Sequence, residues 1–474
     1  MALAVPVAPV AAHPLLVFLL QISLLLLLAL LLGRLAVRLG MPAVVGELCT
    51  GVLLGPSVLD HLAPSLAGWL LPKDPSQFHL LDVVGQLGVL LLVGITGTEV
   101  DAALVRRRGS TAARISVAGF IVPLGLGIAT GYLLPTSLLA DDGDRTVFAL
   151  FLGVAMCVSA IPVIAKTLID MNLLHRNIGQ LILSAGMVDD VVGWLMLSVV
   201  SAMATTGLHA GEVGLSLAYL AAVLILAALV GRPIVRVALR MSARSSDSGP
   251  VVATAVILVL LGAAATHALG LEAVFGAFVV GILIGTCAPS SSQPANTALR
   301  PHMADSSGRT RQFTLARLAP LRAVVLGVLA PLFFATAGLR MDLTALAEPV
   351  VFAAAILVLA VAILGKFAGA YIGARASRMN RWEALALGAG MNARGVIEVI
   401  VAMVGLRLGV LSTAAYTIIV LVAIATSLMA PPLLRYAMRR VDYTSEEQLR
   451  ERNHDQPDGA ASTIRSDLAE GPGT

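Results

Sequence analysis

The chain has 474 residues, of which 58% are hydrophobic and 13% are charged, and its formal net charge at pH 7 is +4. Soluble domains contain about 25% charged residues, so this composition excludes an ordinary soluble protein and indicates one that crosses a membrane several times. The basic residues are spread over the loops between apolar runs, so the positive charge does not point to nucleic acid. Cys49, Cys157 and Cys287 have no partner at disulfide or metal-ligand spacing, and we expect them to pack as small hydrophobic residues.

Apolar runs of about 20 residues predict roughly thirteen transmembrane helices and no strands. We expect the helices near 13–38, 42–60, 81–100, 112–137, 145–170, 178–204, 214–240, 250–268, 270–288, 322–342, 350–374, 382–406 and 410–436. The domains follow as an extracellular N-terminus at 1–12, a first membrane half at 13–288, a polar cytoplasmic linker at 289–321, a second half at 322–437 and a disordered cytoplasmic tail at 438–474. No basic residue precedes the first apolar run, so we expect that helix to be retained.

Basic residues alternate between the loops. The loops after even-numbered helices carry few, among them Lys73, Arg145, Arg340 and Arg407, whereas those after odd-numbered helices carry clusters such as Arg106, Arg107 and Arg108, or Arg232, Arg236, Arg240 and Arg244. Loops rich in Lys and Arg remain in the cytoplasm. The pattern predicts a multi-pass protein of the plasma membrane with its N-terminus outside and its C-terminus inside.

An internal repeat relates two parts of the chain. The motif LLVGITGTEVD ends at Asp101 and the similar motif PLFFATAGLRMD ends at Asp342, and each precedes a unit of three predicted helices, at about 112–204 and 350–436. An odd number of helices separates the units, so they enter the membrane from opposite sides. Such inverted repeats are typical of secondary transporters.

The middle helix of each unit contains a break. Within 145–170, Pro162 removes a backbone hydrogen bond that Ser159 can partly replace, and within 382–406 the run GAGMNARG includes Asn392, which could supply a neutral oxygen. Simple kinks are the alternative, because Pro and Gly are common in membrane helices. Matched breaks in two inverted units nevertheless favour a binding site near the bilayer midplane.

Two adjacent aspartates, Asp189 and Asp190, lie in the middle of the apolar run LILSAGMVDDVVGWLMLSVVSAM. A charge at that depth costs about 3 kcal/mol or more. Adjacent helical residues point about 100° apart, so the two cannot share a partner, and one can face a water-filled cavity while the other faces a neighbouring helix. A bound proton or cation would relieve the strain, which predicts cation transport coupled to protons.

Three other charged residues lie at membrane depth. Lys366 is the expected ion-pair partner of one aspartate, although a structural salt bridge or a lysine that extends to the membrane surface is the alternative. Arg394 and Glu398 are four residues apart, on one helix face, and are expected to form a structural ion pair beside the second break.

These residues lie within blocks that resemble the cation:proton antiporter superfamily and its sodium/hydrogen exchanger domain, closest to the Kef-like, monovalent cation:proton antiporter-2 type branch. The blocks include PAVVGELCTGVLLGPSVL, SAIPVIAKTL, GMVDDVVGW, LGKFAGAYIGAR and GMNARGVIEV, and the resemblance covers about residues 15–437. It implies a six-helix core with two crossed broken helices, a separate dimerisation domain and an elevator-like movement. It also implies that Asp190 binds the monovalent cation transiently and protons, that Asp189 pairs with Lys366 when the ion is absent, and that exchange is electrogenic.

The chain departs from part of the family. Potassium-efflux members carry a nucleotide-binding tail and often Gln-Asp at the acidic pair, whereas this chain has Asp-Asp and a short polar tail. Many relatives have a Thr in the first break, where this chain has Ser159-Ala160-Ile161-Pro162.

The sequence thus predicts an antiporter that exchanges Na+ or K+ for protons, works as a homodimer and needs no cofactor. An exporter or symporter of an organic anion or ionophore-type substrate on the same fold is the alternative, and a channel or sensor is a further one. No nucleophile, metal cluster or phosphate-binding loop supports an enzyme.

Overall fold

The structure, a computed structural model, describes residues 11–71, 75–100, 102–141, 143–171, 173, 176–206, 210–245, 247–287, 316–442, 444 and 447. Within these ranges the regular structure is helical, and the β-type pairing found there is an isolated bridge between Leu139 and Leu411. Ten of the described helices are long and apolar enough to span a membrane, or eleven with the bent pair Arg381–Met391 and Val396–Arg407, and two further apolar helices are shorter. The all-helical polytopic membrane fold is confirmed, while the count of thirteen spans remains a prediction.

The helices before residue 210 are α1 (Ala12–Arg38), α2 (Ala43–Leu54), α3 (Leu59–Leu62), α4 (Pro64–Leu70), α5 (Pro75–Glu99), α6 (Ala102–Leu133), α7 (Arg145–Cys157), α8 (Ile161–Asp170) and α9 (Asn177–Thr206). The middle of the chain forms α10 (Ala210–Leu226), which continues through the π-helical η2 (Ala227–Gly231) into α11 (Arg232–Ser242), then α12 (Gly249–Ala268) and α13 (Ala273–Cys287). The last part forms α15 (Ala319–Val324), η3 (Val325–Leu329), α16 (Ala330–Leu339), α17 (Pro349–Ala376), α18 (Arg381–Met391), α19 (Val396–Arg407) and α20 (Thr413–Met438).

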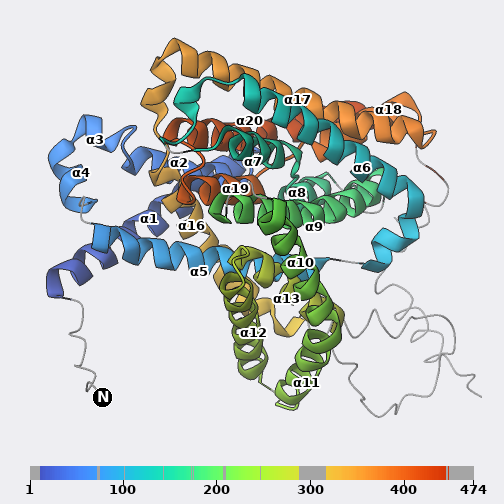
Figure 1. Cartoon of the computed structure of the whole chain (residues 1–474), viewed down its shortest axis with the longest axis horizontal. Helices are drawn as coiled ribbons and strands as arrows, with labels where there is room; N and C mark the ends of the chain where they lie inside the picture. The colour runs from blue at the N-terminus through green and yellow to red at the C-terminus, as the bar shows by residue number, and fades with distance from the viewer. Residues whose placement is uncertain are drawn as a thin grey trace, which may run out of the picture.

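The helices form two groups (Figure 1). The group that we call the core contains α6–α9 and α17–α20, and it includes both units expected at about 112–204 and 350–436. Within it α6 packs along α17, and α18 packs on α20. The second group, which we call the scaffold, contains α1, α2, α5, α10–α13, α15 and α16, with α5 packed between α13 and α16.

Close packing between α6 and α17 depends on small residues. A Cβ added at Gly369 would lie 2.5 Å from the backbone oxygen of Ala118, and one added at Gly373 would lie 2.7 Å from the Cα of Ile115. Small residues let two membrane helices approach at backbone distance. Lys366 lies one turn before Gly369 and two before Gly373 on this face of α17, so the contact also directs the lysine toward the interior of the core.

Helix ends in the core follow from local capping. The Asn380 side chain accepts hydrogen bonds from the backbone N–H groups of Trp382 and Glu383, and Glu383 accepts in return from the Asn380 N–H, a capping box at the start of α18. Asp144 caps α7 in the same way, through the N–H groups of Thr146 and Val147. The outer ends of both broken helices are therefore fixed.

Several expected segments differ from the structure or lie outside the described residues. Residues 1–10 and 288–315 lie outside, so the extracellular terminus and most of the linker are not tested, and α15 begins at Ala319, within the range expected to be linker. In the described part of the expected disordered tail, Met438, Val441 and Glu447 are buried, whereas Arg439, Arg440, Asp442 and Thr444 are exposed. Of the three cysteines, Cys157 and Cys287 are buried but Cys49 is exposed.

Candidate ion-binding site

The two broken helices meet at their breaks. The chain between α7 and α8 runs extended from Val158, and the chain between α18 and α19 leaves the helix at Asn392. The backbone N–H of Ala160 donates to the carbonyl of Ala393 at 3.1 Å, so one break is hydrogen-bonded to the other. Four backbone groups at each helix end lack an intrahelical partner, and four such ends converge here.

Pro162 has a different local role from the one expected. Pro162 is the second residue of α8, and the N–H groups of a helix's first turn have no acceptor within the helix, so a proline there breaks no hydrogen bond. Pro162 therefore lies at the start of a new helix rather than at a kink in a continuous one. Ser159 does not bond back along its own helix, since its Oγ lies 3.1 Å from the carbonyl of Met391 and 3.2 Å from Oδ2 of Asp189. The side chain of Pro162 lies outside the described residues.

Asp189 is held by three groups from three different segments. The Nζ of Lys366 on α17 donates to its Oδ2 at 2.5 Å, and Ser116 on α6 donates to its Oδ1 at 2.6 Å. The third is Ser159, and the lysine also donates to the carbonyl of Cys157, at the end of α7, at 2.5 Å. Lys366 and Asp189 are both fully buried, and a buried ion pair is stable only where further hydrogen bonds satisfy it, as here.

Asp190 has the opposite environment. It is fully buried, yet neither carboxylate oxygen has a hydrogen-bond partner in the described part of the chain. The turn of about 100° between neighbouring helix positions explains why Lys366 reaches one aspartate and not the other. A buried carboxylate without a partner is costly as an anion, and a bound proton or cation removes that cost.

Asn392 presents a second unpaired group at the crossing. It is fully buried at the end of α18, and neither its Oδ1 nor its Nδ2 has a partner among the residues described. Buried amides are normally hydrogen-bonded, so an unpaired one indicates a ligand or water. A neutral amide oxygen and a carboxylate are both ligand types that suit alkali cations.

Arg394 and Glu398 form the ion pair expected of them, with Nη1 3.2 Å from Oε1. Arg394 also donates to the last carbonyls of α7, those of Ala155 at 2.9 Å and Met156 at 2.6 Å, and to Ala362 of α17 at 2.9 Å. The carbonyls of Ala155 and Met156 are ones that the break leaves without a helical donor. The arginine therefore replaces the missing turn of α7 with fixed donors, a structural role.

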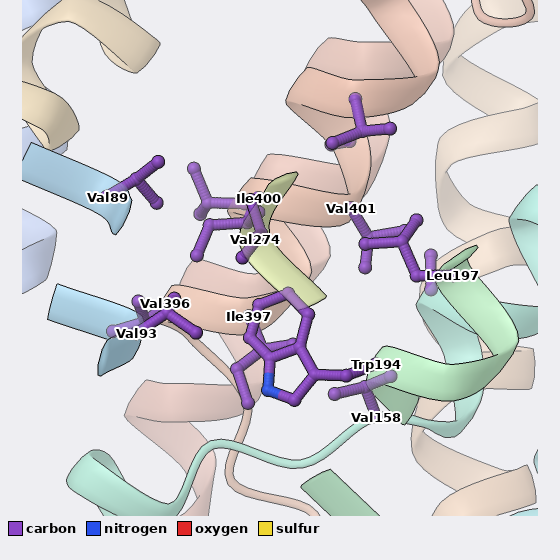
Figure 2. Close-up of a cluster of buried hydrophobic side chains, with 14 of the residues drawn as sticks. Val89, Val93, Val158, Trp194, Leu197, Val274, Val396, Ile397, Ile400 and Val401 are labelled. Carbon is purple, nitrogen blue, oxygen red and sulfur yellow. The ribbon is translucent and has the colours of Figure 1, made fainter. Parts of the chain in front are cut away.

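The core meets the scaffold beside this crossing through apolar side chains. Figure 2 shows Val396, Ile397, Ile400 and Val401 of α19 with Trp194 and Leu197 of α9, facing Val89 and Val93 of α5 and Val274 of α13. The Trp194 ring lies 5.9 Å from that of Phe278 on α13. This part of the contact is thus non-directional, and polar contacts between the two groups lie elsewhere, at Tyr416 with the Ala337 carbonyl and at Arg407 with Glu272.

A cavity of about 240 Å³ approaches the crossing between core and scaffold. Its lining includes Val163 near the start of α8, Val396 at the start of α19, and Thr167 and Arg435, together with the turn between α1 and α2. The cavity lies on the side where α1 and α20 end, the side that the charge pattern assigns to the cytoplasm. Among the described residues no group of three or more His, Cys, Asp and Glu side chains could hold a metal ion.

A sequence profile described as "Sodium/hydrogen exchanger, transmembrane" matches residues 23–439. The chain belongs to this sodium/hydrogen exchanger family. It is 32% identical over 424 residues to the Na+/H+ antiporter NhaS4 of Synechocystis sp., covering 89% of this chain and 97% of that protein. It is 27% identical over 427 residues to the Na+/H+–K+ antiporter GerN of Bacillus cereus, covering 90% and 97%. The family consists of transporters.

The fold also matches a solved structure. The sodium proton antiporter MjNhaP1 from Methanocaldococcus jannaschii superimposes with a TM-score of 0.65 at 16% identity, over 90% of this chain and 99% of that one. At that identity the likeness shows the fold alone.

Sequence reasoning missed two contributors to the site and one contact at the far end of α9. Ser116 lies in an ordinary apolar stretch of α6, and only the approach of α6 to α17 brings it to Asp189. The Cys157 carbonyl is a backbone group that no side-chain motif marks. The contact away from the site is made by Glu447, which lies 3.2 Å from Arg176 Nε and accepts from the Asn177 N–H at 2.7 Å, at the start of the helix that carries both aspartates.

Proposed function

We propose that this protein is a secondary active antiporter that exchanges a monovalent cation, Na+ or K+, for protons across the plasma membrane. The observation that carries the proposal is the contrast between the two aspartates: Asp189 is fully satisfied, whereas Asp190 is buried with both oxygens unpaired in the part of the chain described. The names of similar proteins, Na+/H+ and Na+/H+–K+ antiporters, support the same activity.

Competition for Asp190 gives the mechanism. A proton or a cation neutralises the buried carboxylate, but both cannot occupy it, so release of one permits binding of the other. Asn392, with its unpaired amide oxygen, completes the coordination of a partly dehydrated cation. Asp190 is neutralised by either a bound proton or a bound cation, and this lowers the cost of moving its carboxylate past apolar surface. Without a proton or cation the carboxylate is an anion, and the site stays where water reaches it.

Movement of the core against the scaffold exposes the site alternately to the two sides. The breaks are bonded to each other and to Arg394, so Asp190 travels with a rigid unit, while the contact with the scaffold beside the crossing is made by apolar side chains. In this scheme a cation that also engages Asp189 frees Lys366, whose proton then adds to the transport count and makes the exchange electrogenic. The protein works as a homodimer, with its N-terminus outside and its C-terminus in the cytoplasm.

Transport in everted membrane vesicles tests the proposal. With an acidic interior and a pH-sensitive dye, added Na+, Li+ or K+ is expected to release protons from vesicles that contain the native chain and not from those with Asp190→Asn. Asp144→Asn makes the same Asp-to-Asn change at an exposed helix cap away from the crossing, where the amide oxygen can still cap α7, and as the matched control it is expected to retain exchange. If no cation releases protons although the native chain is correctly inserted, small-cation antiport is wrong, and an organic anion or ionophore-type substrate becomes the leading candidate.

A further inference from the structure

One face of α9 carries four polar residues in register. Trp194, Ser198 and Ser201 lie four, eight and eleven positions after Asp190 on this helix. At about 100° per residue, all four project within roughly 80° of one another. All are buried, with exposed fractions of 0% for Asp190, 1% for Trp194, 0% for Ser198 and 3% for Ser201.

None of these four side chains has a hydrogen-bond partner in the described residues. The unpaired atoms are both oxygens of Asp190, the indole Nε1 of Trp194 and the hydroxyls of Ser198 and Ser201. Other hydroxyls of α9 behave differently: Ser184 donates to the Gln180 carbonyl at 2.7 Å, and Thr205 donates to the Ala202 carbonyl at 3.0 Å. A membrane helix ordinarily satisfies its serines in this way, so the row is an exception.

Buried polar groups that lack protein partners are usually satisfied by water or a ligand. An isolated case would point to a single trapped water. Four successive positions on one face, which begin at the candidate ion carboxylate, define a line instead. From Asp190 to Ser201 it rises about 16 Å along α9, toward the end of the helix that the charge pattern assigns to the outside.

We propose that Trp194, Ser198 and Ser201 form the wall of a hydrated track along which the monovalent cation passes between Asp190 and the outer face. The serine hydroxyls supply oxygen ligands in place of part of the cation's water shell, and the indole N–H holds the accompanying water. The track lies on the side of the core that faces the scaffold, where Trp194 contacts Phe278 of α13, and it widens as the core moves. The inference rests on the proposed antiport and adds its outer path.

Thiol labelling locates the track. Ser198→Cys and Ser201→Cys, each in the full chain, are treated in intact cells with a membrane-impermeant maleimide, and the native chain, with its own three cysteines, is the blank. Val200→Cys is the matched control, because Val200 is buried at the same depth but is turned by about 100° or more from both serines. Both serine variants are expected to be labelled from outside, more slowly when Na+ or K+ is present, and the control is expected to stay unlabelled.

Substitution by alanine gives a second readout that distinguishes the two explanations. On a hydrated track, Ser198→Ala with Ser201→Ala removes two ligands, so the KM for the external cation is expected to rise about threefold or more. In dry apolar packing the same change removes two unsatisfied hydroxyls, so the Tm rises and the KM is unchanged. Unlabelled cysteine variants together with an unchanged KM would overturn the track.

The two proposals fail in different ways. If the native chain shows no cation-driven proton flux, antiport is wrong whatever the labelling shows. If the native chain exchanges and Asp190→Asn does not, while the serine variants behave as in dry packing, antiport stands and only the outer path is wrong.

Discussion

Lys366 and Asp189 form a fully buried ion pair, with 2.5 Å between Nζ and Oδ2, although 177 residues separate them in the chain. The lysine also donates to the last carbonyl of α7, so one ammonium group joins α17, α9 and the first break. The pair leaves Asp190 as the unpaired carboxylate in the described part of the crossing. The ion pair thereby gives two identical, adjacent side chains different roles: Asp189 is held in the structure, and Asp190 is free to bind.

The ion pair predicts a partial rescue by a second substitution. Lys366→Gln alone leaves Asp189 as an uncompensated buried charge, and Asp189→Asn alone does the same to the lysine, so each is expected to cost about 3–5 kcal/mol. The double variant removes both charges and should recover more than half of the lost stability. Thermal unfolding in detergent measures all three variants, and additive losses in the double variant would show that the pair is not coupled.

The contact between α6 and α17 predicts a position where one methyl group is harmful. Gly369→Ala places a Cβ against the Ala118 carbonyl, so the helices must separate, at a cost of about 1–3 kcal/mol. Because Lys366 lies one turn away, the rate of exchange should fall as well. Gly125→Ala on α6 is the control, since nothing lies within 4 Å of its added Cβ, and it should be neutral or slightly stabilising. Equal effects of the two changes would contradict close packing as the cause.

Glu447 predicts that the segment after α20 is released by acid. Burial raises the pKa of Glu447, but hydrogen bonds from the Thr444 and Asn177 N–H groups and the charge of Arg176 outweigh this, and the net pKa is below its usual value of 4.5. Because the pKa of Glu447 is lower in the docked segment than in the released one, its charge stabilises docking fully at pH values above the pKa of the released segment. This stabilisation is lost as the pH falls through the lower pKa of the docked segment. Docking should thus be intact at pH 7 and weaken in acid below pH 4.5.

Hydrogen–deuterium exchange over residues 441–447 measures this docking. Glu447→Gln is expected to raise exchange at neutral pH and to remove the acid dependence, because the glutamine does not titrate. Asp442→Asn changes an exposed carboxylate of the same segment and should leave both unchanged. Identical acid profiles for the native chain and Glu447→Gln would count against the assignment.

We predict that loss of the ion pair between Arg407 and Glu272 affects transport rather than stability. Their side chains meet at 2.7 Å and connect the end of α19 in the core with the residue before α13 in the scaffold. The arginine is 44% exposed, so the pair should add less than about 1 kcal/mol to stability. If the core moves, the contact must open in each cycle, and Arg407→Gln and Glu272→Gln should each shift the KM for the cation by a similar factor.

A double-mutant cycle completes that test. Arg407→Gln with Glu272→Gln should have no larger effect than either single change, because both remove the same contact. Glu348→Gln, beside the start of α17, is the control for loss of a carboxylate elsewhere and should leave the KM unchanged. Independent, additive shifts would mean that the two residues act separately.

The architecture was predictable because the length of each apolar run and the charge of each loop depend only on the local sequence. Each described membrane helix overlaps an expected one, most of them within a few residues at both ends, although α5 begins at Pro75 and α6 at Ala102, earlier than the expected 81 and 112. The two breaks were visible as Pro162 and the run from Gly388 to Gly395. Helix geometry indicated that only one aspartate would reach Lys366, since neighbouring positions diverge, but it did not say which one; the family resemblance implied Asp189. That choice depends on the rotation of α9 against α17, which is set by packing.

Other parts of the site could not be read from the sequence. Ser116 becomes relevant only through the close approach of α6 and α17, a tertiary fact with no local pattern. Residues after 438 are polar and charged, which favours disorder, yet Arg176 is a buried cation that needs an anion, and Glu447 supplies one. Composition cannot foresee that Glu447 also accepts from the Asn177 N–H, 270 residues away.

The distance along the chain between Asp189 and Lys366 also constrains how the protein is made. Asp189 is synthesised 177 residues before the lysine that neutralises it, which at ribosomal speed is roughly 10–35 s. During that interval α9 must enter the bilayer with both carboxylates protonated or wait beside the insertion machinery. The contacts of Asp189 with Ser116 and Ser159 can form within the first half, but its ion pair forms only after α17 has been made.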